Sequence, residues 1–216
     1  MALLRVDSSI RHEGSVSREL TGVVERAWRA AGPDAPVVHR DLAAEPDLGT
    51  TWPQLARAGM RAGAPSEPVA AALADEVLAA DAVVVGAPMY NFGVPAVVKS
   101  WIDVLIVDPR FDPRSTPVGT ALAGMPVVLV VACGGGYGPG TPRAGWDHAT
   151  PYLRRIFADV FGADVTTVVA ELTATAHDPA LAALRPLAER SHADAVAAAS
   201  EAGAAARRRP AALRTA

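Results

Sequence analysis

The apolar run at residues 126–133, PVVLVVAC, constrains the fold more than any other part of the chain. It is rich in valine and is followed at once by a glycine-rich loop. The run is far shorter than the roughly 20 apolar residues that cross a bilayer. Short, uninterrupted apolar runs are typical of strands buried on both faces of a parallel sheet. We therefore expect a central strand here.

Other short apolar segments alternate with segments of helical spacing along the chain. The expected strands are 2–6, 37–40, 82–86, 126–133 and 165–170, and the expected helices are 17–31, 68–80, 96–106, 148–160 and 179–206. This alternation is typical of a doubly wound α/β protein. We predict one domain over residues 1–206, with a flavodoxin-like five-stranded parallel sheet of order 2-1-3-4-5 and helices on both faces. Ligands of such sheets bind beyond the carboxyl ends of the strands.

Two long segments, 41–65 and 107–124, break this alternation and are rich in proline, glycine and aspartate. We expect both to be irregular. Because long loops inside a compact domain usually serve a function, they are expected to wall an active site or to meet a partner subunit.

Charge is unevenly distributed along the chain and argues against one class of partner. Residues 207–216 hold four arginines and no acidic residue, whereas the rest of the chain holds 16 basic and 23 acidic residues. An acidic body repels a phosphate backbone, so we expect no nucleic-acid partner. The basic segment 207–216 is expected to be a frayed, solvated tail.

The chain contains one cysteine, Cys133, which excludes an intramolecular disulfide. Residues 1–11 lack the pattern of a signal peptide, and we expect a cytoplasmic protein that does not enter a membrane. The five histidines lack metal-ligand spacing, so no metal site is predicted. Cys133 ends a core strand and is expected to be packed rather than to act as a nucleophile.

Hydroxyl groups gather in the loop after the first expected strand. Ser9, Ser15 and Ser17 stand where a helix begins, and unpaired helix amides attract anions there. The loop lacks the Gly-Lys of a triphosphate-binding loop and the glycine spacing of a dinucleotide site, which favours a phosphate monoester. The alternative is that Ser15 or Ser17 only caps the helix.

Two more loops of unusual composition follow the third and fourth expected strands. Residues 88–95, PMYNFGVP, combine flat aromatic rings, an amide and stiffening prolines, which suits a planar heteroaromatic ring. Residues 133–140, CGGGYGPG, allow the main chain to approach a ligand and to offer it N–H donors. The alternatives are a proline-rich turn with packed aromatics and a flexible glycine loop.

The segments SSIRHEGSVS, PMYNFGVPAVVKSWID and VVACGGGYGPG resemble the family of FMN-dependent NADH-azoreductases and quinone reductases, over roughly residues 2–170. The resemblance implies an FMN site with its phosphate, its ring and ribityl chain, and its pyrimidine edge at three loops. The implied residues are Ser9, Ser15, Val16 and Ser17 for the phosphate, Met89, Tyr90, Asn91 and Phe92 along the ring and ribityl chain, and Cys133, Gly134, Gly135 and Gly136 at the pyrimidine edge.

By this resemblance, the chain would transfer two electrons from NADH or NADPH to a quinone or azo acceptor by a ping-pong mechanism. The flavin would carry the chemistry without a catalytic side chain, Asn91 would bond the flavin edge, and Phe92 would stack on the substrate. The resemblance also implies a homodimer with the active site near the interface. The family often has an arginine where Gly134 stands and a bulky apolar residue near Asp159, which leaves the acceptor open.

Two other functions are consistent with these loops. One is a flavodoxin-like electron carrier without turnover. The long segments 41–65 and 107–124 argue against it, because small carriers usually lack long loops that build a pocket. The other is a hydrolase or transferase that uses the serine loop without flavin. The absence of a Gly-x-Ser-x-Gly motif weighs against it.

Overall fold

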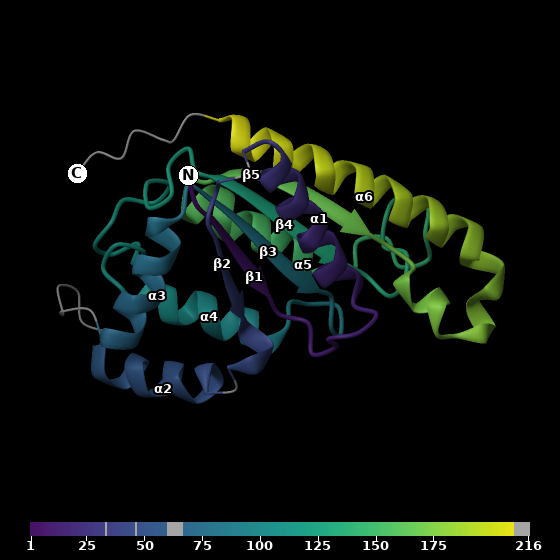
Figure 1. Ribbon diagram of the computed structural model, residues 1–216. Coiled ribbons are helices and arrows are strands. Elements are labelled where there is room, and N and C mark those ends of the chain that lie inside the picture. The colour runs from purple at the N-terminus through teal and green to yellow at the C-terminus, as the bar shows by residue number, and fades with distance from the viewer. Residues whose placement is uncertain (33, 46, 60–66, 210–216) are drawn as a thin grey trace.

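The computed structural model describes residues 1–32, 34–45, 47–59 and 67–209. Its centre is a five-stranded, fully parallel sheet of order β2-β1-β3-β4-β5 (Figure 1). The strands are β1 (Leu3–Asp7), β2 (Val37–Asp41), β3 (Ala82–Pro88), β4 (Pro126–Ala132) and β5 (Asp164–Ala170). The predicted sheet order is confirmed, and β4 is a buried central strand.

Helices cover both faces of the sheet, as predicted. The helices are α1 (Val16–Ala30), α2 (Leu48–Gly59), α3 (Pro68–Ala79), α4 (Ala96–Val107), α5 (Ala149–Arg154) and α6 (Arg185–Arg208). The π-helical segment η2 (Arg155–Val160) continues α5, and the short 3-10 segments are η1 (Leu42–Ala44), η3 (Thr173–Ala176) and η4 (Pro179–Leu184). Helices α1 and α6 lie side by side on one face, and α3, α4 and α5 cover the other (Figure 1).

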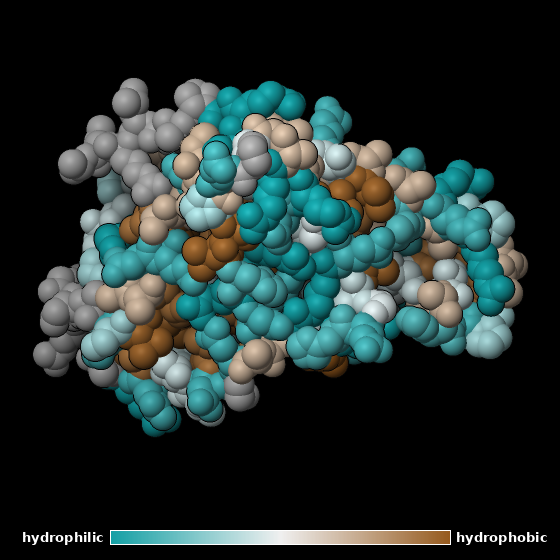
Figure 2. Space-filling view, in the orientation of Figure 1, coloured by the Kyte–Doolittle hydropathy of each residue, from teal (hydrophilic) through white to brown (hydrophobic). Residues whose placement is uncertain are grey.

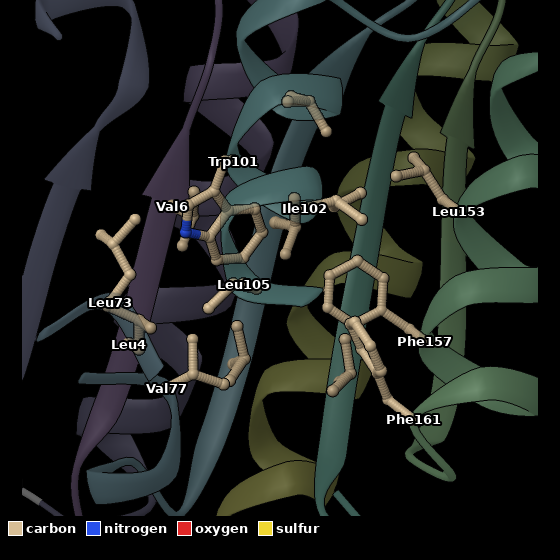
Figure 3. Packing of buried hydrophobic residues seen from close by; sticks show 14 of the residues in the cluster. Leu4, Val6, Leu73, Val77, Trp101, Ile102, Leu105, Leu153, Phe157 and Phe161 are labelled. Atoms are coloured by element: carbon tan, nitrogen blue, oxygen red, sulfur yellow. The ribbon is translucent and has the colours of Figure 1, made fainter. Parts of the chain in front are cut away.

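Buried aromatic residues gather on the face covered by α3, α4 and α5. Trp101 of α4 is fully buried and lies 6.2 Å from Phe157, whose ring contacts Phe161 edge to face at 5.7 Å (Figure 3). Phe111, from the long segment before β4, contacts Phe161 at 5.1 Å. Bulky rings therefore fill this half of the core.

The opposite face packs through alanine. Helix α6 turns its small residues Ala195, Ala199, Ala202 and Ala206 into the core against α1. Gly203 allows the closest approach, because a Cβ atom there would lie 2.3 Å from the carbonyl oxygen of Val24. The alanine content of the chain thus serves close helix packing.

The expectation that segment 41–65 is irregular is wrong for its described part, because residues 48–59 form α2. Gly49 and Pro53 disfavour a helix locally, but the buried residues Leu48 and Leu55 pack α2 against the core beside α4. Residues 60–65 lie outside the described residues. Segment 107–124 contains turns after Val107, as expected.

The expected helix 179–206 consists of η4 followed by α6, which continues to Arg208. The guanidinium of Arg207 lies 5.2 Å from the centre of the Trp28 ring, and Arg209 pairs with Asp164. The first residues of the basic segment 207–216 therefore contact the domain. Residues 210–216 lie outside the described residues.

Within the described residues, no helix combines the length and apolarity needed to cross a bilayer. On the face shown in Figure 2, hydrophilic side chains predominate and hydrophobic ones form separate patches.

We predict that Gly203→Ala lowers the free energy of unfolding by about 1–3 kcal/mol, because the new methyl group displaces α6 from α1. Helix propensity alone would raise stability by roughly 1 kcal/mol, so the sign discriminates packing from propensity. Urea unfolding measures the change for Gly203→Ala and for Ser200→Ala, an exposed control on the same helix that reports helix propensity alone. A Gly203→Ala variant as stable as the parent chain would contradict this account.

Candidate functional site

Four loops meet at the carboxyl edge of the sheet because every strand runs in the same direction. They follow β1, β3, β4 and β5. The edge lies at the switch point where β1 pairs with β3 in the register Asp7 opposite Gly86. Gly86 allows close packing here, since a Cβ atom would lie 2.8 Å from the Thr21 side chain and 3.1 Å from Asp7.

The loop after β1 leads its serines into the start of α1. Ser15 is the N-cap of α1, with its hydroxyl 3.4 Å from the Arg18 amide and 3.3 Å from the Ser17 hydroxyl. Both separations exceed the usual length of a hydroxyl hydrogen bond, so a stronger acceptor could compete for these protons. The first-turn amides, including those of Val16 and Ser17, have no acceptor within an α-helix. Capping and anion binding are compatible here.

Arg18 holds this serine loop in place. Its guanidinium donates to the carbonyl oxygens of Ser9, at 2.6 Å, and Arg11, at 3.1 Å, and pairs with Asp41 at 2.7 Å. The hydrogen bond from Arg18 to Asp41 raises the pKa of the guanidinium above its already high value. The loop is therefore fastened to the end of β2.

Tyr90 joins the serine loop to the loop after β3. Its hydroxyl lies 3.4 Å from the Ser9 hydroxyl and accepts a hydrogen bond from the Ile10 amide at 3.2 Å. Tyr90 and Gly93 exchange two main-chain hydrogen bonds around a tight turn. The two central residues, Asn91 and Phe92, have φ angles of 49° and 70°, which a type I′ turn requires.

Phe92 occupies a turn position that favours glycine, and its ring is 40% exposed. The ring makes edge contacts with Trp146 at 5.7 Å and with Tyr137 at 6.3 Å, both from the loop after β4. Its carbonyl oxygen accepts a hydrogen bond from the His148 amide at 2.9 Å. The loops after β3 and β4 therefore meet at an aromatic cluster of Phe92, Tyr137 and Trp146.

The glycine loop after β4 is tied to the segment after β5. The carbonyl oxygens of Cys133, Gly134 and Gly135 accept hydrogen bonds from the main chain of residues 172–174. The amides of Gly134, Gly135 and Gly136 donate to no protein acceptor within the described parts of the chain. Unpaired main-chain donors at a sheet edge suit an anionic or carbonyl-bearing ligand.

Cys133 is fully buried in the hydrophobic core, and burial raises the pKa of its thiol to about 12. A thiol that stays protonated at neutral pH is a poor nucleophile. The expectation that Cys133 is packed is confirmed.

The loops enclose a cleft of about 270 Å³. Of the residues proposed from sequence, it is lined by Ser9, Ser15, Val16, Ser17, Met89, Tyr90 and Gly134. Asn91, Phe92, Cys133, Gly135 and Gly136 belong to the same loops but do not line it. Asn91 instead lines a neighbouring hollow of about 640 Å³ with Lys99, His148 and Tyr152, and Tyr90 lines both.

The sequence analysis missed part of the cleft wall. Arg11, from the serine loop, and the residues Thr173, Ala174, His177 and Asp178, which follow β5, also line it. Ligands of parallel sheets bind beyond the carboxyl ends of the strands, and this rule applies to β5 as it does to β1, β3 and β4. The rule could have indicated these residues.

The chain was compared with known proteins. Residues 1–194 match the model of a flavodoxin-like fold family. A Frankia casuarinae FMN-dependent NADH:quinone oxidoreductase is 40% identical over 207 residues, covering 91% of this chain and 96% of the relative. The protein of the same name from Nocardia farcinica is 38% identical over 213 residues, covering 90% and 94%.

The chain belongs to the family of FMN-dependent NADH:quinone oxidoreductases. The predicted resemblance is confirmed. Among solved structures, the azoreductase from Bacillus anthracis is similar with a TM-score of 0.71 at 26% identity, covering 95% of this chain and 99% of that one.

The cleft has the donor set that this family's cofactor needs. Hydroxyls and helix amides at its α1 end suit a phosphate monoester, and the unpaired amide of Gly134 suits the carbonyl edge of a flavin ring. The residues present therefore fit FMN.

The ion pair of Arg18 and Asp41 makes stability depend on pH. Burial opposes ionisation of Asp41, but the hydrogen bond and charge of Arg18 outweigh it and hold the pKa of this carboxyl below its usual range. A lowered folded-state pKa stabilises the protein above the unfolded value, near pH 4, and this contribution is lost as pH falls through the folded value.

We predict that Asp41→Asn lowers the free energy of unfolding by about 1–2 kcal/mol at pH 7 and that the difference narrows as pH falls below about 4. Urea unfolding across this range measures it. Asp103→Asn, which removes the partner of the exposed Lys99, is the matched control and should cost about 0.5 kcal/mol or less. A difference for Asp41→Asn that does not change with pH would contradict the assignment.

Proposed function

We propose that this protein is an FMN-dependent oxidoreductase that transfers two electrons from NADH or NADPH to a quinone or azo compound. One observation carries the proposal: Tyr90 joins the serine loop to the loop after β3 at a cleft that the glycine loop also lines. The names of the relatives support the same activity.

The residues of the cleft would divide the binding of FMN among them. Ser15, Ser17 and the first-turn amides of α1 would hold the phosphate, with Arg11 adding positive charge nearby. Met89 and Tyr90 would contact the ring and ribityl chain, and the free amide of Gly134 would face the pyrimidine edge. When bound, FMN supplies the redox chemistry, taking hydride from the nicotinamide and passing electrons to the acceptor.

The aromatic cluster of Phe92, Tyr137 and Trp146 would form the wall against which the acceptor packs. A side chain held at a φ of 70° costs backbone energy, and such strain gathers at functional sites. Phe92 exposes 40% of its surface while bearing that cost, which favours a ligand contact over a packing role. We infer ping-pong kinetics, since donor and acceptor would take turns at one cleft.

The structure weakens one argument against an electron carrier and supplies another. Helix α2 removes part of the case built on long irregular loops, but the exposed aromatic cluster gives a substrate wall that a carrier does not need. A serine hydrolase is disfavoured because the serine hydroxyls bond one another and Tyr90, with no histidine partner among the described residues.

We predict that the purified protein binds FMN and that anaerobic NADH or NADPH bleaches the flavin absorbance. Steady-state oxidation of NADH should then depend on added quinone or azo dye, since the acceptor must reoxidise the cofactor. Bleaching without acceptor-dependent turnover would leave an electron carrier. Failure to bind FMN would overturn the proposal.

Ser17→Ala is predicted to raise the Kd of FMN about tenfold while leaving that of riboflavin, which lacks the phosphate, almost unchanged. Ser17 is preferable to Ser15 for this test because Ser15 also caps α1. Fluorescence titration with both flavins gives the two constants. Equal weakening of both would mean that Ser17 does not contact the phosphate.

We also infer a cytoplasmic homodimer whose second subunit completes the pocket. The support is the family resemblance and the exposure of Phe92 and Trp146 beside the cleft. Sedimentation velocity should give twice the mass of one chain, and a monomer at micromolar concentration would refute the dimer.

A further inference from the structure

Glu171, the residue directly after β5, binds the far end of the glycine loop, at Tyr137 and Gly138. One carboxylate oxygen, Oε1, accepts hydrogen bonds from two consecutive main-chain amides, Tyr137 at 2.7 Å and Gly138 at 3.0 Å. Its own amide donates to the Ser191 hydroxyl of α6 at 2.9 Å. Glu171 therefore connects the loop to both β5 and α6.

The near end of the same loop is held by the residues that follow Glu171. The amide of Thr173 donates to the carbonyl oxygen of Cys133, and the amide of Ala174 to that of Gly134. The loop is thus held at both ends from one segment. The amides of Gly134, Gly135 and Gly136 remain without a protein acceptor within the described structure, and Gly134 lines the cleft. Residues 172–174 hold Gly134 and Gly135 through their carbonyl oxygens, and Glu171 fixes the loop beyond Gly136, where glycine leaves the backbone free to adopt other conformations.

The carboxylate of Glu171 lines a hollow other than the cleft, together with Tyr137 and Gly138. Its connection to the cleft therefore runs through the glycine loop that it holds.

We propose that Glu171 is a positioning residue that holds the glycine loop, and with it the Gly134 amide, toward the cofactor. This inference rests on the proposed function for its ligand. The two hydrogen bonds need only a single acceptor oxygen and no negative charge.

The test compares Glu171→Ala with Glu171→Gln in the full chain reconstituted with FMN. Glu171→Ala removes the acceptor and should raise the Kd of FMN on the order of tenfold, as followed by flavin fluorescence. Glu171→Gln keeps a carbonyl oxygen for both amides and should retain most of the affinity.

Glu189→Gln is the matched control, since Glu189 is an exposed acid on α6 near the same region. It should leave the affinity for FMN unchanged. Unchanged FMN affinity in Glu171→Ala, or a Glu171→Gln variant as weak as Glu171→Ala, would overturn the positioning role.

A readout without cofactor keeps this inference separate from the proposed function. Hydrogen exchange at the amides of Tyr137 and Gly138 should be faster in Glu171→Ala than in the parent chain, whether or not FMN binds. Unchanged exchange would show that Glu171 does not hold the loop. Faster exchange in Glu171→Ala, in a protein that binds no FMN, would confirm that Glu171 holds the loop and would contradict the proposed ligand.

Discussion

The parallel register of β1 and β3 is the constraint on which the site depends. Asp7 stands opposite Gly86, and the absence of a side chain at Gly86 lets β3 pass close beneath the start of α1. Asp7 is fully buried there and accepts hydrogen bonds from Thr21 at 2.7 Å and Arg5 at 2.9 Å. These contacts set the distance between the loops that follow the two strands. The bridge from Tyr90 to the serine loop exists because that distance is short.

Much of the fold could be predicted because the residue composition of most strands and helices indicates their type. Valine runs marked β3 and β4, and the alternation of element types fixed a parallel sheet. Helix α2 was missed because Gly49 and Pro53 are poor helix residues, and only tertiary contacts of Leu48 and Leu55 explain the helix. Local propensity contains no information about such contacts.

The candidate site was predictable where its residues are chemically unusual. The serine, tyrosine-asparagine and glycine loops carry hydroxyls, rings and free amides that stand out in any sequence. The residues after β5 that line the cleft form no recognisable motif, and only their place at the end of a strand indicates them; they are Thr173, Ala174, His177 and Asp178. The positions of Asn91 and Phe92, outside the cleft lining, follow from a type I′ turn that their residue types do not favour.

Arg18 and Asp41 connect the cleft to the edge of the sheet. Strand β2 has a neighbour on one side only, so it is the strand most prone to local opening at that edge. When Asp41, the last residue of β2, separates from the sheet, Arg18 loses its ion-pair partner. The guanidinium is then held less firmly against the carbonyl groups of the serine loop. Fraying of a peripheral strand and occupancy of the binding site are then thermodynamically coupled, and a ligand that steadies the loop must in return protect β2 against fraying.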